Sequence, residues 1–154
     1  MALVPHRLLI VDDDPDVRWM LETRFEHEPD IELLPSAGNG LEALGLVGAY
    51  LPDAVVLDLE MPLMDGARAI PDLRRLAPAM GIVVYSSSGR AGELCGDAMP
   101  DAVVPKGSPL TELVNTVRTV VGRVAGQGMP GRVVHRTTGE EDVLGTAAVP
   151  EATA

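Results

Sequence analysis

Acidic, hydroxyl and basic side chains stand at the ends of four short apolar runs in this sequence. Asp12 and Asp13 follow RLLIV, Asp58 follows AVVL, Ser86 closes GIVVYS, and Lys106 follows AVVP. Crowded carboxylates raise one another's pKa values unless a cation lies among them, and Mg²⁺ binds one or two carboxylates while keeping several waters. A carboxylate can also attack phosphorus, and an ammonium group neutralises a transferred phosphoryl group. If the runs are neighbouring parallel strands, these side chains form one phosphoryl-transfer site.

Lys106 is the only lysine in a chain that has eleven arginines. The two residue types are not interchangeable, because lysine carries a compact charge on a flexible stem and arginine carries a rigid planar fork. Two interpretations are open from composition alone. Lys106 is either a solvated surface lysine placed by chance, or the ammonium that a site at the end of this run requires.

The other candidate residues also have structural explanations. Asp12 and Asp13 could cap a following helix, since aspartate is favoured at helix N-termini. Asp14 is assigned to that capping role. Asp58 could be a strand-end turn residue, although its place between a Val-rich run and MPLMDG favours a functional role. Ser86 has two further serines beside it, either of which could replace it.

Short apolar strands alternate with helical segments along the chain, which predicts a parallel sheet with helices on both faces. Such α/β sheets bind their ligands beyond the carboxyl ends of the strands. The expected strands are residues 7–12, 31–37, 53–58, 81–86 and 101–106.

Capping residues and apolar periodicity predict the helices. Asp14 and Pro15 start the first helix, a turn at Asn39-Gly40 precedes the second, and the third begins after Pro71. The fourth is short, residues 91–98, because glycines interrupt it. Apolar residues at helical spacing continue from 110 to 124 and predict the last helix. The inward positions expected in the first three helices are Val17, Met20, Leu21, Phe25, Leu41, Leu44, Val47, Leu73 and Leu76.

Composition limits the kinds of protein that this chain can be. Its 154 residues suit one domain, and a net charge of −11 argues against direct DNA binding and against an anionic membrane surface. One cysteine and the absence of a long apolar run favour a cytoplasmic protein. We expect a folded domain over residues 1–124 and a flexible or disordered tail over 125–154, which is rich in small and polar residues.

Four motifs in this order, VDDDPDVR, VVLDLEMPLMDG, VVYSSS and VVPKGSP, make the chain resemble the receiver domain of bacterial two-component response regulators, of the chemotaxis-regulator type. The resemblance covers roughly residues 7–124. It implies a flavodoxin-like, doubly wound α/β fold with five parallel strands in the order 2-1-3-4-5.

The resemblance also implies a role for each candidate residue. Asp58 would be the phosphoacceptor, and Asp12 and Asp13 would hold Mg²⁺ together with Asp58 itself. The backbone carbonyl of Glu60 would complete the protein ligands of the metal. Ser86 would be the switch hydroxyl. Lys106 would pair with the phosphoryl group.

The sequence departs from the family pattern at three places. Val103 stands where the family often has an aromatic residue that moves on phosphorylation. Gly107 follows the lysine where proline is common, so a cis bond, which costs about 2.5–4 kcal/mol without proline, is in doubt here. The glycine-rich fourth-helix region, residues 87–101, leaves the usual output surface in question.

The function expected from this resemblance is a phosphorylation-switched signalling receiver. A histidine kinase or a phosphotransfer protein would donate the phosphoryl group, and an output protein of unknown identity would read the change by direct contact. The chain is expected not to be a turnover enzyme.

Two alternatives stay open at this point. A pseudo-receiver would have the same fold and bind partners without phosphorylation. A phosphatase of the haloacid dehalogenase type would use an aspartate nucleophile, but it would carry a second aspartate where this chain has Glu60.

Overall fold

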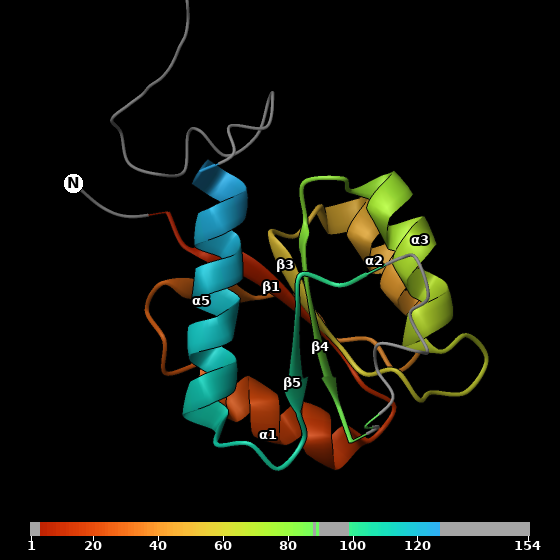
Figure 1. Cartoon of the computed structure of the whole chain (residues 1–154), viewed down its shortest axis with the longest axis horizontal. Coiled ribbons are helices and arrows are strands. Elements are labelled where there is room, and N and C mark those ends of the chain that lie inside the picture. The colour runs from red at the N-terminus through yellow and green to blue at the C-terminus, as the bar shows by residue number, and fades with distance from the viewer. Residues whose placement is uncertain (1–3, 88, 90–98, 127–154) are drawn as a thin grey trace, which may run out of the picture.

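Five parallel strands form one sheet in the order β2-β1-β3-β4-β5, which confirms the expected fold and strand order (Figure 1). The computed structural model describes residues 4–87, 89 and 99–126. Within them, each predicted strand is present, although several end a residue or more earlier than expected. The strands are β1 (His6–Val11), β2 (Ile31–Leu33), β3 (Ala54–Leu57), β4 (Gly81–Ser86) and β5 (Ala102–Pro105).

Helices cover both faces of the sheet (Figure 1). One face packs against α1 (Pro15–Phe25) and α5 (Leu110–Gly126), and the other packs against α2 (Gly40–Tyr50) and α3 (Gly66–Leu76). The central strands β1, β3 and β4 are almost wholly buried and supply Val, Ile and Leu to both faces. Continuous apolar runs of this kind are what a parallel sheet covered on both sides requires.

Side-chain caps start three of the helices. Asp14 accepts a hydrogen bond from the amide of Asp16, and Pro15 occupies the first turn, so the predicted start of α1 is confirmed. Asp65 caps α3 by accepting from the amide of Arg68. Asn39, which was predicted only to form a turn, caps α2 in the same manner.

The predicted start of α3 after Pro71 is wrong, because the helix begins five residues earlier, at Gly66. A proline inside a helix loses one backbone hydrogen bond. Here the cap at Asp65 and the burial of Ile70 and Leu73 against the sheet outweigh that loss.

Three of the predicted inward positions are exposed: Met20, Leu41 and Leu76. In α2 the residues Ala43 and Val47 pack in the core on the sheet, which leaves Leu41 facing outward. Leu76 is the last residue of α3 and lies beyond the core that covers Leu73. The size of the side chains decides which residues of a helical face can lie closest to the sheet, and apolar periodicity carries no information on size.

The last helix agrees best with its prediction. Its buried residues are Leu113, Val114, Val117, Val120 and Val121. The helix ends at Gly126, two residues into the predicted tail, and residues 127–154 lie outside the described part of the chain, as does the predicted fourth helix over 91–98. The domain boundary at residue 124 therefore stays a prediction.

None of the helices in the described ranges is both long and apolar enough to cross a bilayer.

A cluster of charges joins α5 to the connection between α1 and β2. The guanidinium of Arg118 donates to both carboxylate oxygens of Asp30, at 2.8 and 2.9 Å, and also contacts Glu28. Arg24 pairs with the same Glu28. The hydrogen bonds from arginine hold the pKa values of Asp30 and Glu28 below their ordinary values of 3.8 and 4.5.

Replacing Arg118 by methionine is expected to lower the free energy of unfolding at pH 7 by about 1 kcal/mol, since this pair is bidentate but partly open to solvent. Acids with a depressed pKa in the folded state contribute stability above their unfolded pKa, and that contribution is lost as the pH falls through the folded value. The difference between wild type and Arg118→Met should therefore shrink below about pH 4. Urea denaturation across this range measures it.

Arg123→Met is the matched control, because Arg123 is exposed on the same helix and makes no ion pair with the described residues. An equal loss of stability in both variants would show that the Arg118 cluster contributes nothing of its own.

Candidate functional site

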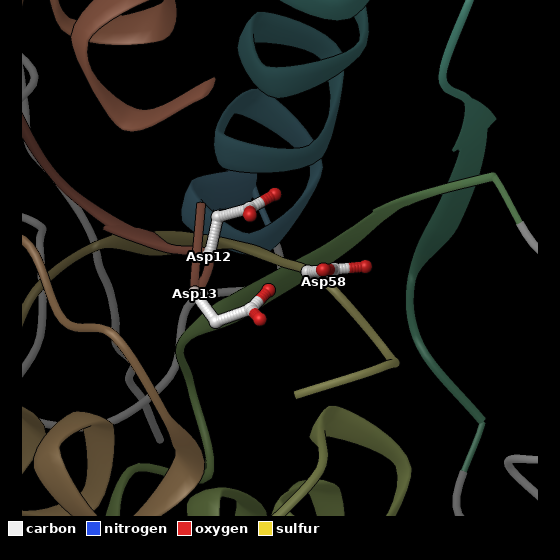
Figure 2. A group of neighbouring side chains, drawn as sticks. All are labelled: Asp12, Asp13 and Asp58. Carbon is white, nitrogen blue, oxygen red and sulfur yellow. The ribbon is translucent and has the colours of Figure 1, made fainter. Parts of the chain in front are cut away.

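Three carboxylates lie together at the carboxyl edge of the sheet. Asp12 and Asp13 directly follow β1, and Asp58 directly follows β3, its hydrogen-bonded neighbour (Figure 2). One oxygen from each lies within 4.8 Å of the others. Asp12 and Asp58 are buried, at 1% and 5% exposure, whereas Asp13 is exposed. The group therefore has two inner carboxylates and one on the solvent side.

Lys106 supplies the positive charge of this cluster from the end of β5. Its Nζ lies 2.7 Å from Oδ2 of Asp12 and 3.4 Å from Oδ2 of Asp58. Burial alone would lower the pKa of Lys106, but the hydrogen bond to Asp12 and the charges of both carboxylates outweigh it and raise that pKa. Lys106 is thus a charged partner of the acidic group, and not a solvated surface lysine.

One ammonium does not balance three carboxylates. Burial, and then the charge of Asp12, raise the pKa of Asp58, while Lys106 and the amide of Glu60 act in the opposite direction. The remaining negative charge and the all-oxygen donors suit a hard divalent cation such as Mg²⁺. The carboxylates of Asp12, Asp13 and Asp58 fit such an ion.

The acid pair does not cap α1, since Asp14 does. Instead, Oδ1 of Asp12 accepts from the amide of Asp14, at 2.9 Å. The carbonyl of Asp12 accepts from Nη1 of Arg18, one turn into α1. Sequence reasoning missed Arg18, whose only signal was its place in the VDDDPDVR motif. These contacts leave Oδ2 of Asp12 for Lys106.

Ser86 and Lys106 are linked through the backbone. Ser86 ends β4, is 2% exposed, and its carbonyl accepts from the amide of Lys106 at 3.0 Å. Ser87 is exposed. Of these two serines, Ser86 is therefore the one built into the edge of the sheet, and its role as the switch hydroxyl stays a prediction.

Two of the departures from the family pattern have a structural outcome. Val103 lies on β5 and is 44% exposed, so an exposed aliphatic side chain occupies the position where the family often has an aromatic ring. Gly107 has a φ of 105°, a conformation that favours glycine over residues with a side chain. No peptide bond in the described part of the chain is cis. Gly107 thus turns the chain after Lys106 by a positive φ.

Gly66 lets the loop that follows Asp58 pack closely against the backbone of Asp58. Its amide donates to the carbonyl of Leu59 at 3.0 Å, and a Cβ atom there would overlap the carbonyl oxygen of Asp58. Gly40 approaches the same loop, since its amide donates to the carbonyl of Met64 at 2.8 Å. Close backbone approach is the reason for glycine at both positions.

The fold and the acidic edge together define a class of protein, the flavodoxin-like signalling domains with a carboxylate cluster at the carboxyl ends of β1 and β3. Residues 8–118 match the model of the response regulator receiver domain. The chain belongs to the response regulator receiver family.

Solved structures agree with this assignment. The response regulator domain of CheB from Thermotoga maritima superposes with a TM-score of 0.69 at 26% identity, covering 77% of this chain and 97% of that one. A response regulator from Chloroflexus aurantiacus gives 0.70 at 32% identity over 77% and 99%. TrrA from Thermotoga maritima, solved in complex with Mg²⁺ and BeF, gives 0.68 at 29% identity over 75% and 98%.

Curated relatives are longer than this chain. A protein-glutamate methylesterase/protein-glutamine glutaminase from Caulobacter vibrioides is 40% identical over 56% of this chain and 25% of its own length. The Bacillus subtilis protein of that name is 29% identical over 94% of this chain and 43% of its own length. The chain thus spans less than half of the relatives it matches.

These names correct one expectation. The sequence was interpreted as that of a protein that is not a turnover enzyme, whereas its relatives are named as methylesterases and glutaminases. The resemblance that carried the expectation extends over the receiver portion only, and that portion does not report the activity of a whole protein.

Gly66→Ala is expected to destabilise the protein by about 1–3 kcal/mol, the range for a forced overlap in a packed site. The backbone of Asp58 must move to admit the new methyl group. Gly48→Ala is the control, because Gly48 lies inside α2 with nothing within 4 Å of a Cβ atom. That change should stabilise by about 0.5–1 kcal/mol. Thermal melts of both variants test the pair, and equal stability of the two would contradict this account.

Proposed function

We propose that this chain is a phosphorylation-switched receiver in which Asp58 accepts a phosphoryl group from a histidine kinase or a phosphotransfer protein. The observation that carries the proposal is the position of the Lys106 ammonium, 2.7 Å from Asp12 and 3.4 Å from Asp58. A lysine held between two buried carboxylates at the carboxyl edge is suited to neutralise a phosphoryl group on one of them.

Mg²⁺ would be held by the carboxylates of Asp12, Asp13 and Asp58 and by the backbone carbonyl of Glu60. When bound, the ion neutralises charge on the phosphoryl oxygens. The proposal is supported by the three carboxylates within 4.8 Å of one another and by TrrA, which was solved with Mg²⁺ and BeF. Asp13 is the exposed member of the set and would offer its carboxylate to the ion from the solvent side.

In the transfer step, a carboxylate oxygen of Asp58 forms a bond to phosphorus. The bond from phosphorus to the imidazole nitrogen of the donor breaks, and its electron pair returns to that nitrogen. Asp58 must be ionised to attack. Burial and the charge of Asp12 raise the pKa of Asp58, and the charge of Lys106 opposes that rise and so favours the reactive form. Lys106 then pairs with the phosphoryl oxygens, and the hydroxyl of Ser86 donates to one of them.

Phosphorylation of Asp58 would change the surface of the protein by displacing Lys106 and Ser86. Lys106 and Ser86 are joined by a backbone hydrogen bond, so a displacement of either one is felt by the ends of β4 and β5. A partner that contacts this edge would then distinguish the two states. We place the receiver in the cytoplasm, where the donor proteins of such signalling act.

Incubation with acetyl phosphate and Mg²⁺ should give a single base-labile phosphoryl adduct, measured by intact-mass spectrometry. The adduct should be absent in Asp58→Asn and when Mg²⁺ is omitted, because the nucleophile or the charge neutralisation is then missing. Asp53→Asn is a matched control. Asp53 is also a buried aspartate, but it lies at the opposite end of β3, so its replacement should leave the adduct in place.

No adduct from acetyl phosphate or from a histidine kinase, in a protein that is folded by circular dichroism, would overturn the proposal. That result would favour the pseudo-receiver, a domain of the same fold that binds without phosphorylation.

The names of the relatives favour one class of output, a protein-glutamate methylesterase. We propose that phosphorylation of this receiver changes the rate of such an enzyme. The catalytic part of the Bacillus subtilis relative, mixed with the phosphorylated chain, should release methanol from a methyl-esterified glutamyl protein at a different rate than with Asp58→Asn. Equal rates would point to another output.

A further inference from the structure

Among the residues that the structure describes, Tyr85 is an aromatic residue close to the ion pair of Lys106 and Asp12. It is the fifth of six residues in β4, it directly precedes Ser86, and it is 3% exposed. The chain has only two tyrosines, one tryptophan and one phenylalanine, and Phe25 is the other aromatic side chain in the core of the described residues. An aromatic ring at this position, next to the charged cluster, therefore calls for a physical reason.

Strand alternation places Tyr85 on the same face of the sheet as the charged residues. Residues two apart along a strand share a face. Val104, two residues before Lys106, packs in the same cluster as Tyr85, on the side covered by α1 and α5. The residues two before Asp12 and Asp58 belong to that cluster as well; they are Ile10 and Val56.

The strand order places Tyr85 between the backbone of Lys106 and the carboxylate of Asp12 that the lysine reaches. Lys106 leaves β5 and reaches Asp12 at the end of β1, and both β4 and β3 lie between them. Each step between neighbouring strands is about 4.8 Å, so the lysine must lie almost flat across the sheet edge. Tyr85 is the last residue of β4 whose side chain lies on the face that the lysine crosses.

The distances agree with this path. Nζ of Lys106 lies 6.0 Å from the centroid of the Tyr85 ring, at the outer limit of a cation–π contact. Burial raises the pKa of the Tyr85 phenol, and the charges of Lys106 and Asp12 act on it in opposite directions, as expected for a hydroxyl near that ion pair. No hydrogen bond joins this hydroxyl to another of the residues that the structure describes.

We propose that Tyr85 is a positioning residue whose ring holds the Lys106 ammonium over the Asp12–Asp58 pair. The ring supports the aliphatic stem of the lysine and presents an electron-rich face to its charge. Without the ring, the flexible stem is free to swing toward solvent, and the ammonium spends less time where a phosphoryl group would form. The ring, and not the hydroxyl, carries this role. The consequence for phosphorylation rests on the proposed function, but the contact itself does not.

The single lysine makes a direct test possible. With ¹³C-labelled lysine the protein gives one set of side-chain signals, all from Lys106. The ring current of Tyr85 should shift the Cε methylene signal in the wild type and in Tyr85→Phe, which keeps the ring. The shift should be lost in Tyr85→Leu and in Tyr85→Met, two variants that guard against failure of either one to fold.

Phosphorylation by acetyl phosphate is the second readout. Its rate should fall about threefold to tenfold in Tyr85→Leu and stay near the wild-type rate in Tyr85→Phe, given the usual strength of a cation–π contact. Tyr50→Leu is the matched control, because it removes a ring that lies 6.0 Å from the guanidinium of Arg7, away from the site. This control should change neither readout.

The outcomes separate the two proposals. Identical lysine signals in Tyr85→Phe and Tyr85→Leu would overturn the contact. A lost shift with an unchanged phosphorylation rate would overturn the positioning role. No phosphorylation of the wild type itself would sink the proposed function, while the lysine signal would still decide whether the ring of Tyr85 holds the ammonium.

Discussion

Two buried carboxylates, those of Asp12 and Asp58, share one ammonium group, that of Lys106, and the rest of the carboxyl edge depends on this imbalance of charge. Taking either carboxylate out of water is unfavourable, and removing one member of a buried ion pair leaves an uncompensated charge. Lys106 makes the burial of both tolerable, but it leaves net negative charge. The remaining negative charge favours the binding of a cation at this site. With the cation and Lys106 present, a phosphoryl group is favoured there as well.

Backbone geometry keeps these charges close. Parallel pairing of β1 with β3 sets Asp12 and Asp58 side by side, and the amide of Asp58 donates to the carbonyl of Val11 at 2.9 Å. Gly66 lets the following loop return against the carbonyl of Asp58. Arg18 ties the carbonyl of Asp12 to the first turn of α1. The charged side chains of the site are thus held directly at the ends of paired strands.

Relatives of this chain include longer proteins. The receiver fold is shared with regulators of several kinds, and the matched curated proteins are named as methylesterases and glutaminases. In the proposed function the receiver would carry the phosphoryl chemistry, and the output is a separate property, since one fold can host many functions.

Sequence by itself determined the fold class, the five strands and the group of residues at their ends, because alternating short apolar runs and helices leave few topologies and strand ends of a parallel sheet meet at one edge. It also determined the last helix, whose apolar spacing has no gaps. It did not determine that Leu41 and Leu76 face solvent, because close packing against the sheet, and not periodicity, decides which side chains are buried. It also did not determine that α3 begins before Pro71, because the cap at Asp65 outweighs the effect of the proline. Only the tertiary structure showed that Lys106 crosses two strands to reach Asp12 and passes Tyr85, since that path depends on the order of strands that are distant in sequence.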